Sequence, residues 1–267
     1  MRILVVADIH ANRAAIEAIR EPFDACLFLG DLVEYGAEPE ACIDWVRTHC
    51  RQGVRGNHDH GAAQNVDLFG TVGFRYLTRA TRAGTVARLS AADRKFLTAL
   101  PTTAMLTLGG LRFLLVHATP RDPLEEYAPP DPAVWQQRLV GVKADFVCVG
   151  HTHQQFALPV GSTTVLNPGS VGLPRDGDPR ARYAVIDDGK VELKQVEYDV
   201  EATVAALMAS DYEPEEKRQL ADVYRHGKYT FPTGNGNGTS NGHTNGVYKN
   251  GVHAPVGGVV SLASPVR

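Results

Sequence analysis

The sequence lacks long hydrophobic runs and a strong excess of charge of either sign. No stretch approaches the ~18 consecutive apolar residues that a membrane span requires, and the apolar opening at residues 1–8 is too short for a signal peptide. The 30 acidic residues and the 27 lysines and arginines give a net charge of -3, so no general positive field would hold a nucleic-acid backbone. These absences predict a cytoplasmic protein with no membrane partner and no strong nucleic-acid signal.

Cysteine is also scarce, and its spacing does not suit metal binding or redox catalysis. No C-x-x-C pair occurs, so buried, reduced thiols are the expected state of Cys26, Cys42, Cys50 and Cys148. The rest of the composition is ordinary, because 43% of the 267 residues are hydrophobic. A chain of this size can bury one substantial core, and one large domain is therefore expected.

The N-terminal part of the chain alternates between strand and helix patterns. Residues 2–7 and 25–29 are short apolar runs rich in Ile, Leu and Val, which is typical of strands buried on both faces. Apolar residues at helical spacing follow each run, first at residues 12–20, where Asn12 can cap the helix, and then at 38–49. This alternation predicts an α/β sheet.

The middle of the chain departs from this alternation and then returns to strands. Residues 61–100 carry helix-favouring patterns broken at Gly70, Gly73 and Gly84, so we expect a helical insertion there. A Gly109-Gly110 hairpin turn then joins two strands, and further strands follow. The expected strands are 105–108, 111–116, 145–149, 163–166, 183–186 and 191–196. A second sheet packed against the first is expected.

The C-terminal part divides into a helical segment and a tail. Residues 202–225 show helical spacing and are expected to form helices that cover the sheet edge. From Pro232 to Arg267 the composition turns to Gly, Asn, Thr and Ser. Such a segment cannot bury enough apolar surface to offset its ordering entropy. We therefore expect a domain over residues 1–231 and a disordered tail over 232–267.

Five polar clusters follow apolar strands, where ligands bind in open α/β sheets. Taken singly, each has an ordinary explanation, such as a helix cap, a turn residue or a hydrogen-bonded core histidine. In the last cluster, alternate residues of an extended segment would present two imidazoles to one site. Together the clusters offer carboxylate, amide and imidazole ligands that suit two divalent ions. The clusters are Asp8-x-His10, Gly30-Asp31, Gly56-Asn57-His58-Asp59, His117 and Gly150-His151-Thr152-His153.

The ordered set D-x-H, G-D, G-N-H-D, H and G-H-T-H resembles the calcineurin-like metallophosphoesterase superfamily over residues 1–195. Within it the chain is similar to small bacterial phosphoesterases of the YfcE-like branch, including the Asn167-Pro168-Gly169-Ser170 segment. The resemblance implies an α/β fold, a four-layer α-β-β-α sandwich of two mixed sheets with a dinuclear metal site at the strand carboxyl ends. It also implies hydrolysis of a phosphate ester by a hydroxide that two divalent ions (Mn, Fe or Zn) activate, without a protein nucleophile.

The resemblance also implies roles for individual residues. Asp8, His10 and His153 match the ligands of the first metal, Asp31 matches the shared carboxylate, and Asn57, His117 and His151 match the ligands of the second. His58 matches the general acid that protonates the leaving oxygen, although it could instead be a histidine that only supports the ligands. Glu34 and Asp59 are the candidates to orient His58, and Glu34 is favoured because the second acid of the related G-D-x-x-D-R-G pattern takes this role.

One position departs from that pattern. The run Gly30-Asp31-Leu32-Val33-Glu34-Tyr35-Gly36 places Tyr35 where protein phosphatases carry a phosphate-clamping arginine, which argues against protein phosphatase activity. Arg121 or Arg175 could replace that arginine beside Asn57 in substrate binding, or both could be solvated loop charges.

Since a diester carries less charge than a monoester, a diesterase acting on a small phosphorylated molecule is favoured over a monoesterase. A non-catalytic interaction module and a nuclease-like activity on nucleic-acid ends are the alternatives. The complete ligand set counts against the first, and the lack of a basic tract counts against the second.

Overall fold

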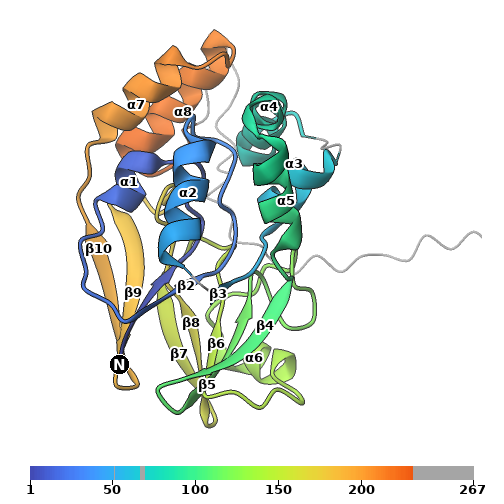
Figure 1. Ribbon diagram of the computed structural model, residues 1–267, viewed down its shortest axis with the longest axis vertical. Helices are drawn as coiled ribbons and strands as arrows, with labels where there is room; N and C mark the ends of the chain where they lie inside the picture. Colours follow the sequence, from blue (N-terminus) through green and yellow to red (C-terminus); the bar gives the residue numbers. More distant parts are fainter. Residues whose placement is uncertain (51, 67–69, 231–267) are drawn as a thin grey trace, which may run out of the picture. The chain divides into compact units, whose positions relative to one another are not determined.

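Two five-stranded sheets packed face to face form the centre of the protein (Figure 1). This computed structural model describes residues 1–50, 52–66 and 70–230. The first sheet has the order β10-β9-β1-β2-β3, in which β1, β2 and β3 are parallel. Its strands are β1 (Arg2–Val6), β2 (Ala25–Phe28), β3 (Gln52–Gly53), β9 (Ala181–Asp187) and β10 (Lys190–Val196).

The second sheet has the order β4-β5-β6-β8-β7, in which β5, β6 and β8 are parallel. Apolar side chains of both sheets, such as Val5 and Leu27 on one and Leu115 and Phe146 on the other, meet in a buried core between them. Removing such surface from water is the main stabilising contribution to the fold. The strands are β4 (Thr103–Leu108), β5 (Leu111–Val116), β6 (Phe146–Cys148), β7 (Phe156–Val160) and β8 (Thr163–Asn167).

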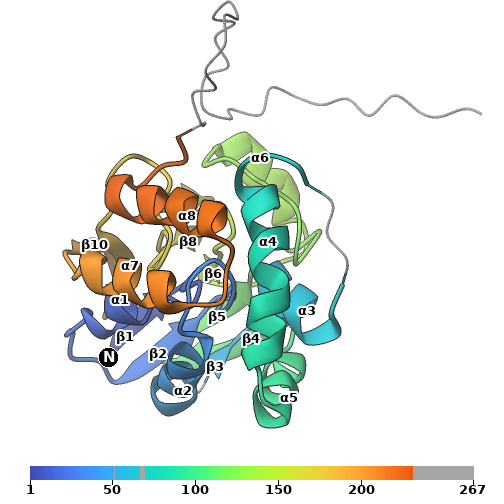
Figure 2. The same ribbon diagram turned by 90° about the horizontal axis from the view of Figure 1, so that it is seen from above.

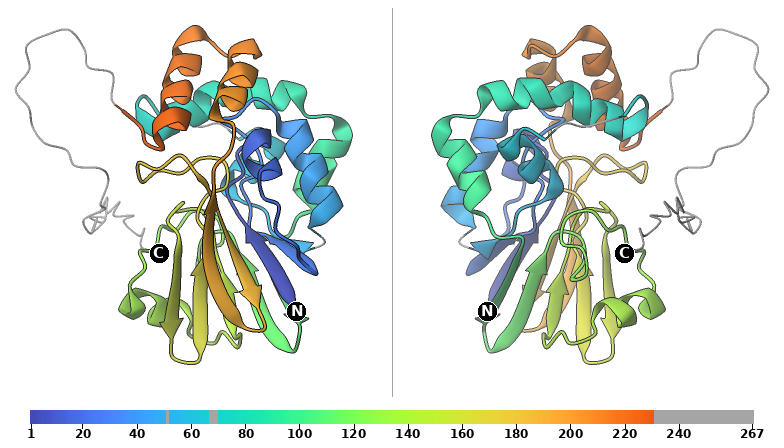
Figure 3. Two further views of the ribbon diagram at one scale, coloured as in Figure 1. Left: turned by 90° about the vertical axis from the view of Figure 1, so that its left-hand side faces the viewer. Right: turned by 90° about the vertical axis from the view of Figure 1, so that its right-hand side faces the viewer.

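Helices cover the outer faces of both sheets and complete the expected four layers. On the first sheet, α1 (Arg13–Glu17) and α2 (Pro39–His49) bury Ile16 and Ile43 against the strands. On the second sheet, α6 (Pro132–Arg138) buries Trp135. The side views in Figure 3 show the two sheets between these outer helices. The predicted α-β-β-α sandwich of two mixed sheets is therefore confirmed.

The remaining helices gather at the end of the sandwich where β1 finishes (Figure 2, Figure 3). The predicted insertion contains α3 (Asn57–Gln64), α4 (Gly73–Arg88) and α5 (Ala91–Ala99). The C-terminal helices are α7 (Val200–Ala209) and α8 (Pro214–His226). They pack on each other, on α1 and on α4, so the expectation that they cover a sheet edge was wrong. Their shared core also includes Tyr35 and Leu173 from loops at the strand ends.

Several local predictions also need correction. Gly84 was expected to break a helix but lies within α4, where an added Cβ would come 2.5 Å from Tyr212 Cε1, so glycine allows this close packing. Strands β3 and β7 and helix α6 were not predicted, because they are short and β7 contains a proline. The expectation of four reduced thiols was wrong for Cys26 and Cys50. These two form a disulfide with Cα atoms 4.6 Å apart, because α2 returns its C-cap to the start of β2.

Two further expectations meet the limits of the described residues. Among those residues no helix combines the length and apolar character that crossing a bilayer requires. The predicted tail, residues 232–267, lies outside the described residues.

Candidate metal centre

All five polar clusters lie where parallel strands end. Asp8 and His10 follow β1, Asp31 follows β2, and Asn57 follows β3 in the first sheet. In the second sheet His117 follows β5, and His151 and His153 follow β6. Because these strands are parallel within each sheet, their carboxyl ends meet at one edge of the sandwich. The structure therefore brings together side chains that are up to 145 positions apart, from Asp8 to His153.

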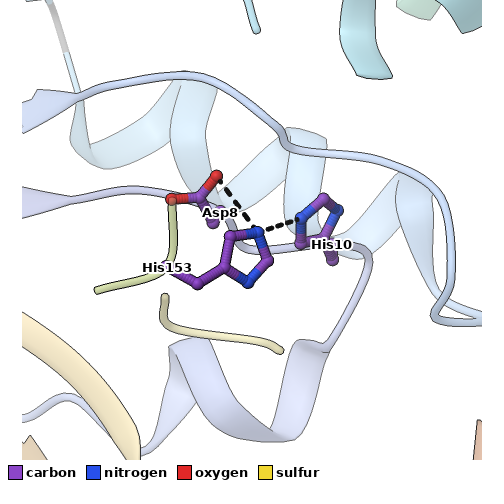
Figure 4. A group of neighbouring side chains, drawn as sticks. All are labelled: Asp8, His10 and His153. Carbon is purple, nitrogen blue, oxygen red and sulfur yellow. Dashed lines mark hydrogen bonds and ion pairs between the residues drawn. The ribbon is translucent and has the colours of Figure 1, made fainter. Parts of the chain in front are cut away.

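Ligand atoms of these residues form three overlapping groups, each with atoms within 4.8 Å of one another. Asp8, His10 and His153 form the first group (Figure 4), in which the Nε2 atoms of the two histidines are 3.2 Å apart. His153 Nε2 is 3.6 Å from Asp8 Oδ1. The other groups are His10 with Asp31 and His58, and Asp31 with His117 and His151. Their members are all buried.

Asp31 joins the first group to the last. Its Oδ2 is 3.2 Å from His117 Nε2 and 3.9 Å from His10 Nε2. On the far side, His117 Nε2 is 3.1 Å from Asn57 Oδ1. One carboxylate therefore lies between two sets of ligand-type atoms, which is the placement expected of a residue shared by two cations.

Backbone carbonyls orient the imidazoles towards the centre. Metal-binding histidines usually donate their second ring N–H to a carbonyl or carboxylate, which leaves the other nitrogen's lone pair for the cation. Three Nδ1 atoms lie within hydrogen-bonding distance of carbonyl oxygens, and their Nε2 atoms face inward. The pairs are His10 with Val33 at 3.1 Å, His117 with Leu29 at 2.8 Å and His153 with Leu173 at 2.5 Å. His151 is reversed, since its Nε2 contacts the carbonyl of Glu125 at 3.3 Å.

The arrangement fits bound cations better than a closed hydrogen-bond network. Asp8 Oδ2 is buried and has no hydrogen-bond partner, although a buried carboxylate oxygen normally has one. The facing Nε2 atoms of His10 and His153 are both acceptors when their Nδ1 atoms carry the protons. A cation placed among these atoms would satisfy all of them, as carboxylate and imidazole ligands suit divalent metals.

The backbone at the centre is unusual. Five of the candidate ligands have left-handed backbone angles, which non-glycine residues rarely adopt and which cost about 1–3 kcal/mol each. The φ angles are 53° at Asp8, 48° at His10, 59° at Asp31, 65° at His151 and 58° at His153. The interpretation of the G-H-T-H segment as extended was therefore wrong. These turns, and not a strand pleat, direct His151 towards His117 and His153 towards His10.

Burial keeps most of these imidazoles neutral. It lowers the pKa of His10 and of His153 well below the usual value, and it lowers the pKa of His151 to about 3. Neutral imidazole is the form that binds metal. Burial also opposes protonation of His117, but the charge of Asp31 outweighs it, and the pKa of His117 rises to about 9.

His58 lies at the rim of the centre. Its Nδ1 is 2.5 Å from Glu34 Oε2, and its Nε2 is 3.8 Å from Asp31 Oδ2. The other candidate partner, Asp59, instead accepts hydrogen bonds from the backbone N–H groups of Asp31, Leu32 and Gly56. The structure therefore places Glu34 against the His58 ring, whereas Asp59 holds together the loops that carry the candidate ligands.

The two candidate arginines differ in position. Arg175 stacks its guanidinium on the Phe74 ring at 4.1 Å, and its buried Nε has no hydrogen-bond partner. After burial, its charge is the largest influence that lowers the pKa of His153, so Arg175 lies close to the centre. The Arg121 side chain is 63% exposed and pairs with Glu126.

Other side chains near the centre belong to its walls. Tyr35 is buried, with its ring 4.8 Å from the His10 ring and its hydroxyl 2.7 Å from Thr78 Oγ1. Sequence reasoning missed Tyr127, whose ring lies 4.1 Å from that of His151, and Arg82 of α4, which pairs with Glu34. Neither belongs to a recognisable motif, because their contacts arise from folding of the loop after β5 and of the insertion.

Comparison with known proteins identifies the family. Residues 1–189 match the calcineurin-like phosphoesterase superfamily domain. An uncharacterized protein of Methanocaldococcus jannaschii is 31% identical over 223 residues, which cover 74% of this chain and 88% of that protein. Among solved structures, a metallophosphoesterase from Sphaerobacter thermophilus is 30% identical and has a TM-score of 0.69 over 85% of this chain and 99% of that one.

A second solved structure agrees in fold. A hypothetical protein from Pyrococcus horikoshii is only 20% identical, but its TM-score is 0.74 over 86% of this chain and 99% of that one. The sandwich, the ligand-type side chains at its strand ends and the match over residues 1–189 agree with one another. The chain therefore belongs to the calcineurin-like phosphoesterase superfamily, a group of metal-dependent phosphoester hydrolases.

Proposed function

We propose that this protein hydrolyses a phosphate ester of a small molecule with the help of two divalent ions. The observation that supports the proposal most is the convergence of seven buried or half-buried ligand-type side chains, with His58 left over beside them. A protein that used the sandwich only as an interaction platform would have no need of this charged, strained and buried set, which costs folding stability.

The ligand roles follow from the distances. Asp8, His10 and His153 would hold one ion, Asn57, His117 and His151 the other, and Asp31 both. Mixed nitrogen and oxygen ligands suit Mn²⁺, Fe²⁺ or Zn²⁺. When bound, such ions supply Lewis acidity that activates water and neutralises charge on the phosphoryl oxygens.

His58 is the residue proposed to protonate the leaving oxygen. Its Nδ1–H donates to Glu34, which fixes the ring, and its Nε2 faces the centre near Asp31. A proton on Nε2 can pass to the ester oxygen as the bond to phosphorus breaks, and a positioned acid of this kind typically contributes about 10²–10⁴-fold in rate. Burial lowers the pKa of His58, which makes its protonated form a stronger acid.

Arg175 and Asn57 are the residues proposed to bind the substrate. Arg175 has a buried, unpartnered Nε and lies close to the centre, so a phosphate oxygen would complete its hydrogen bonds. Tyr35 is packed in the wall and does not replace the clamping arginine of protein phosphatases. A single cationic side chain suits the single charge of a diester, and we propose diesters as the preferred class.

The proposal can be tested with a panel of phosphate esters. Purified protein loaded with Mn²⁺, Fe²⁺ or Zn²⁺ would be assayed against nitrophenyl mono- and diesters and against cyclic and linear nucleotides. We expect hydrolysis that chelators abolish and that metal restores, with diesters favoured. Stoichiometric metal binding without hydrolysis of any ester would contradict the proposal and favour the interaction module.

A further inference from the structure

Helix α4 contacts the loop segment Glu34–Tyr35 at three positions on successive turns. The Tyr35 N–H donates to Thr81 Oγ1 at 3.2 Å, the Tyr35 hydroxyl lies 2.7 Å from Thr78 Oγ1, and Arg82 Nε donates to Glu34 Oε1. Both loop residues have left-handed φ angles, 72° and 63°. Such a backbone persists only where surrounding contacts hold it. The inserted helix therefore supports the segment that presents Glu34.

Arg82 is built into a closely fitted site. It is buried, and its Nη1 donates to the carbonyl of Val66 at 2.7 Å. A Cβ added at Gly61 of α3 would overlap its guanidinium, so glycine makes room for this side chain. Burial lowers the pKa of Arg82 to about 10, which still leaves it charged at neutral pH.

Glu34 is shared between two partners, one on each carboxylate oxygen. Arg82 contacts Oε1, and His58 Nδ1 contacts Oε2. A carboxylate fixed at one oxygen by a planar guanidinium cannot turn freely about its last torsion, because the planar group of arginine orients its partner as well as attracting it. The orientation of the other oxygen, and with it the direction of the His58 ring, is set in this way.

We propose that Arg82 is a positioning residue for the reaction, and that it acts on His58 through Glu34. This inference rests on the proposed function of His58 as the acid. It assigns the helical insertion a second role, because the same helix that carries Phe74 beside Arg175 also holds the orientation of the acid.

Two variants disturb this contact in different ways. Arg82→Met removes the guanidinium and leaves the carboxylate of Glu34 without it. Gly61→Ala keeps every charge but forces the guanidinium to move, and alanine favours the helical conformation over glycine, so this variant should fold. Arg79→Met is the matched control, because Arg79 lies on the exposed face of the same helix.

Kinetics should separate positioning from a general structural effect. At matched metal content, both variants should lose about 10- to 100-fold in turnover for esters with alkoxide leaving groups, the usual effect of losing an orienting partner. The loss should be much smaller for nitrophenyl esters, which need little protonation. In the His58→Ala background Arg82→Met should cost less than about twofold more, because residues that act as a unit are not additive. Arg79→Met should match wild type.

A second measurement does not depend on activity. The His58 Nδ1–H held by a carboxylate should give a downfield proton resonance, identified by its disappearance in His58→Ala. It should persist in Arg79→Met and be lost through exchange in Arg82→Met and Gly61→Ala. A persistent signal in both variants, or a kinetic loss that is equal for all leaving groups and additive with His58→Ala, would overturn the inference. A wild-type protein that hydrolyses nothing would overturn the proposed function, and the resonance would then still decide whether Arg82 holds His58.

Discussion

Asp31 is the residue whose neutralisation should disturb the metal centre most. Its Oδ2 lies 3.2 Å from His117 Nε2 and 3.9 Å from His10 Nε2, which belong to opposite sides of the centre. Its Oδ1 accepts the backbone N–H of His58 at 2.9 Å. Asp31→Asn keeps the shape and this hydrogen bond, so the change removes charge and little else.

The expected size of the effect follows from the distances. Two unit charges about 4 Å apart interact by about 4 kcal/mol at the effective dielectric constant of about 20 that suits protein sites. A loss of this size corresponds to roughly a thousandfold in affinity. Because Asp31 lies between both ligand sets, the variant should bind each of the two ions roughly a thousandfold more weakly. Hydrolysis at metal concentrations that saturate the wild type should be lost with the ions.

Calorimetric titration with Mn²⁺ or Zn²⁺, combined with metal analysis after desalting, would measure this loss. Asp8→Asn is the matched control, since Asp8 lies beside His10 and His153 only. It should weaken one ion and spare the other. If Asp31→Asn retained both ions at wild-type affinity, or lost only one as Asp8→Asn does, Asp31 would not be the shared ligand.

Four further outcomes are expected. His58→Ala should keep both ions and slow hydrolysis by about 10²–10⁴-fold for poor leaving groups, and a loss that does not depend on leaving-group pKa would assign His58 to phosphate binding. Arg175→Ala should lower kcat/KM by about 10- to 100-fold through a lost charged hydrogen bond, whereas Arg121→Ala should not, and equal effects would refute the distinction. Deleting residues 232–267 should leave turnover of small substrates unchanged, and a large loss from a folded core would contradict this. In the metal-free protein, burial raises the pKa of Asp8 from 3.8 to about 7, so the folded state binds the proton more tightly and Asp8's contribution to stability is lost as pH rises from about 4 to 7. Urea unfolding of Asp8→Asn should lack this component, and identical pH profiles would contradict it.

The sequence alone was sufficient for the architecture and for the set of candidate ligands. Strand and helix patterns are local properties of the chain, so periodicity predicted most strands of both sheets. The polar residues that end β1, β2 and β5 were visible because each interrupts an apolar run. Elements with weak local signals were missed, such as β3 with two residues and β7 with its proline. Their strand character comes from pairing with neighbours that local patterns do not show.

Only the tertiary structure decided which partner each side chain has. Glu34 and Asp59 are equally plausible partners of His58 in the sequence, but the fold turns Asp59 to the backbone of the Asp31 loop and Glu34 to the imidazole. Arg175 and Arg121 are both loop arginines, and packing against Phe74 holds only the first beside the centre.

The same holds for Arg82, which lies 48 positions from Glu34 in the chain. Its contact depends on how α4 packs over the loop after β2, and no local pattern encodes that packing. The identity of the ligands is thus a property of short motifs, which the sequence displays. The orientation of the acid and of the arginines depends on long-range packing and buried charge pairs, which arise only when distant segments fold together.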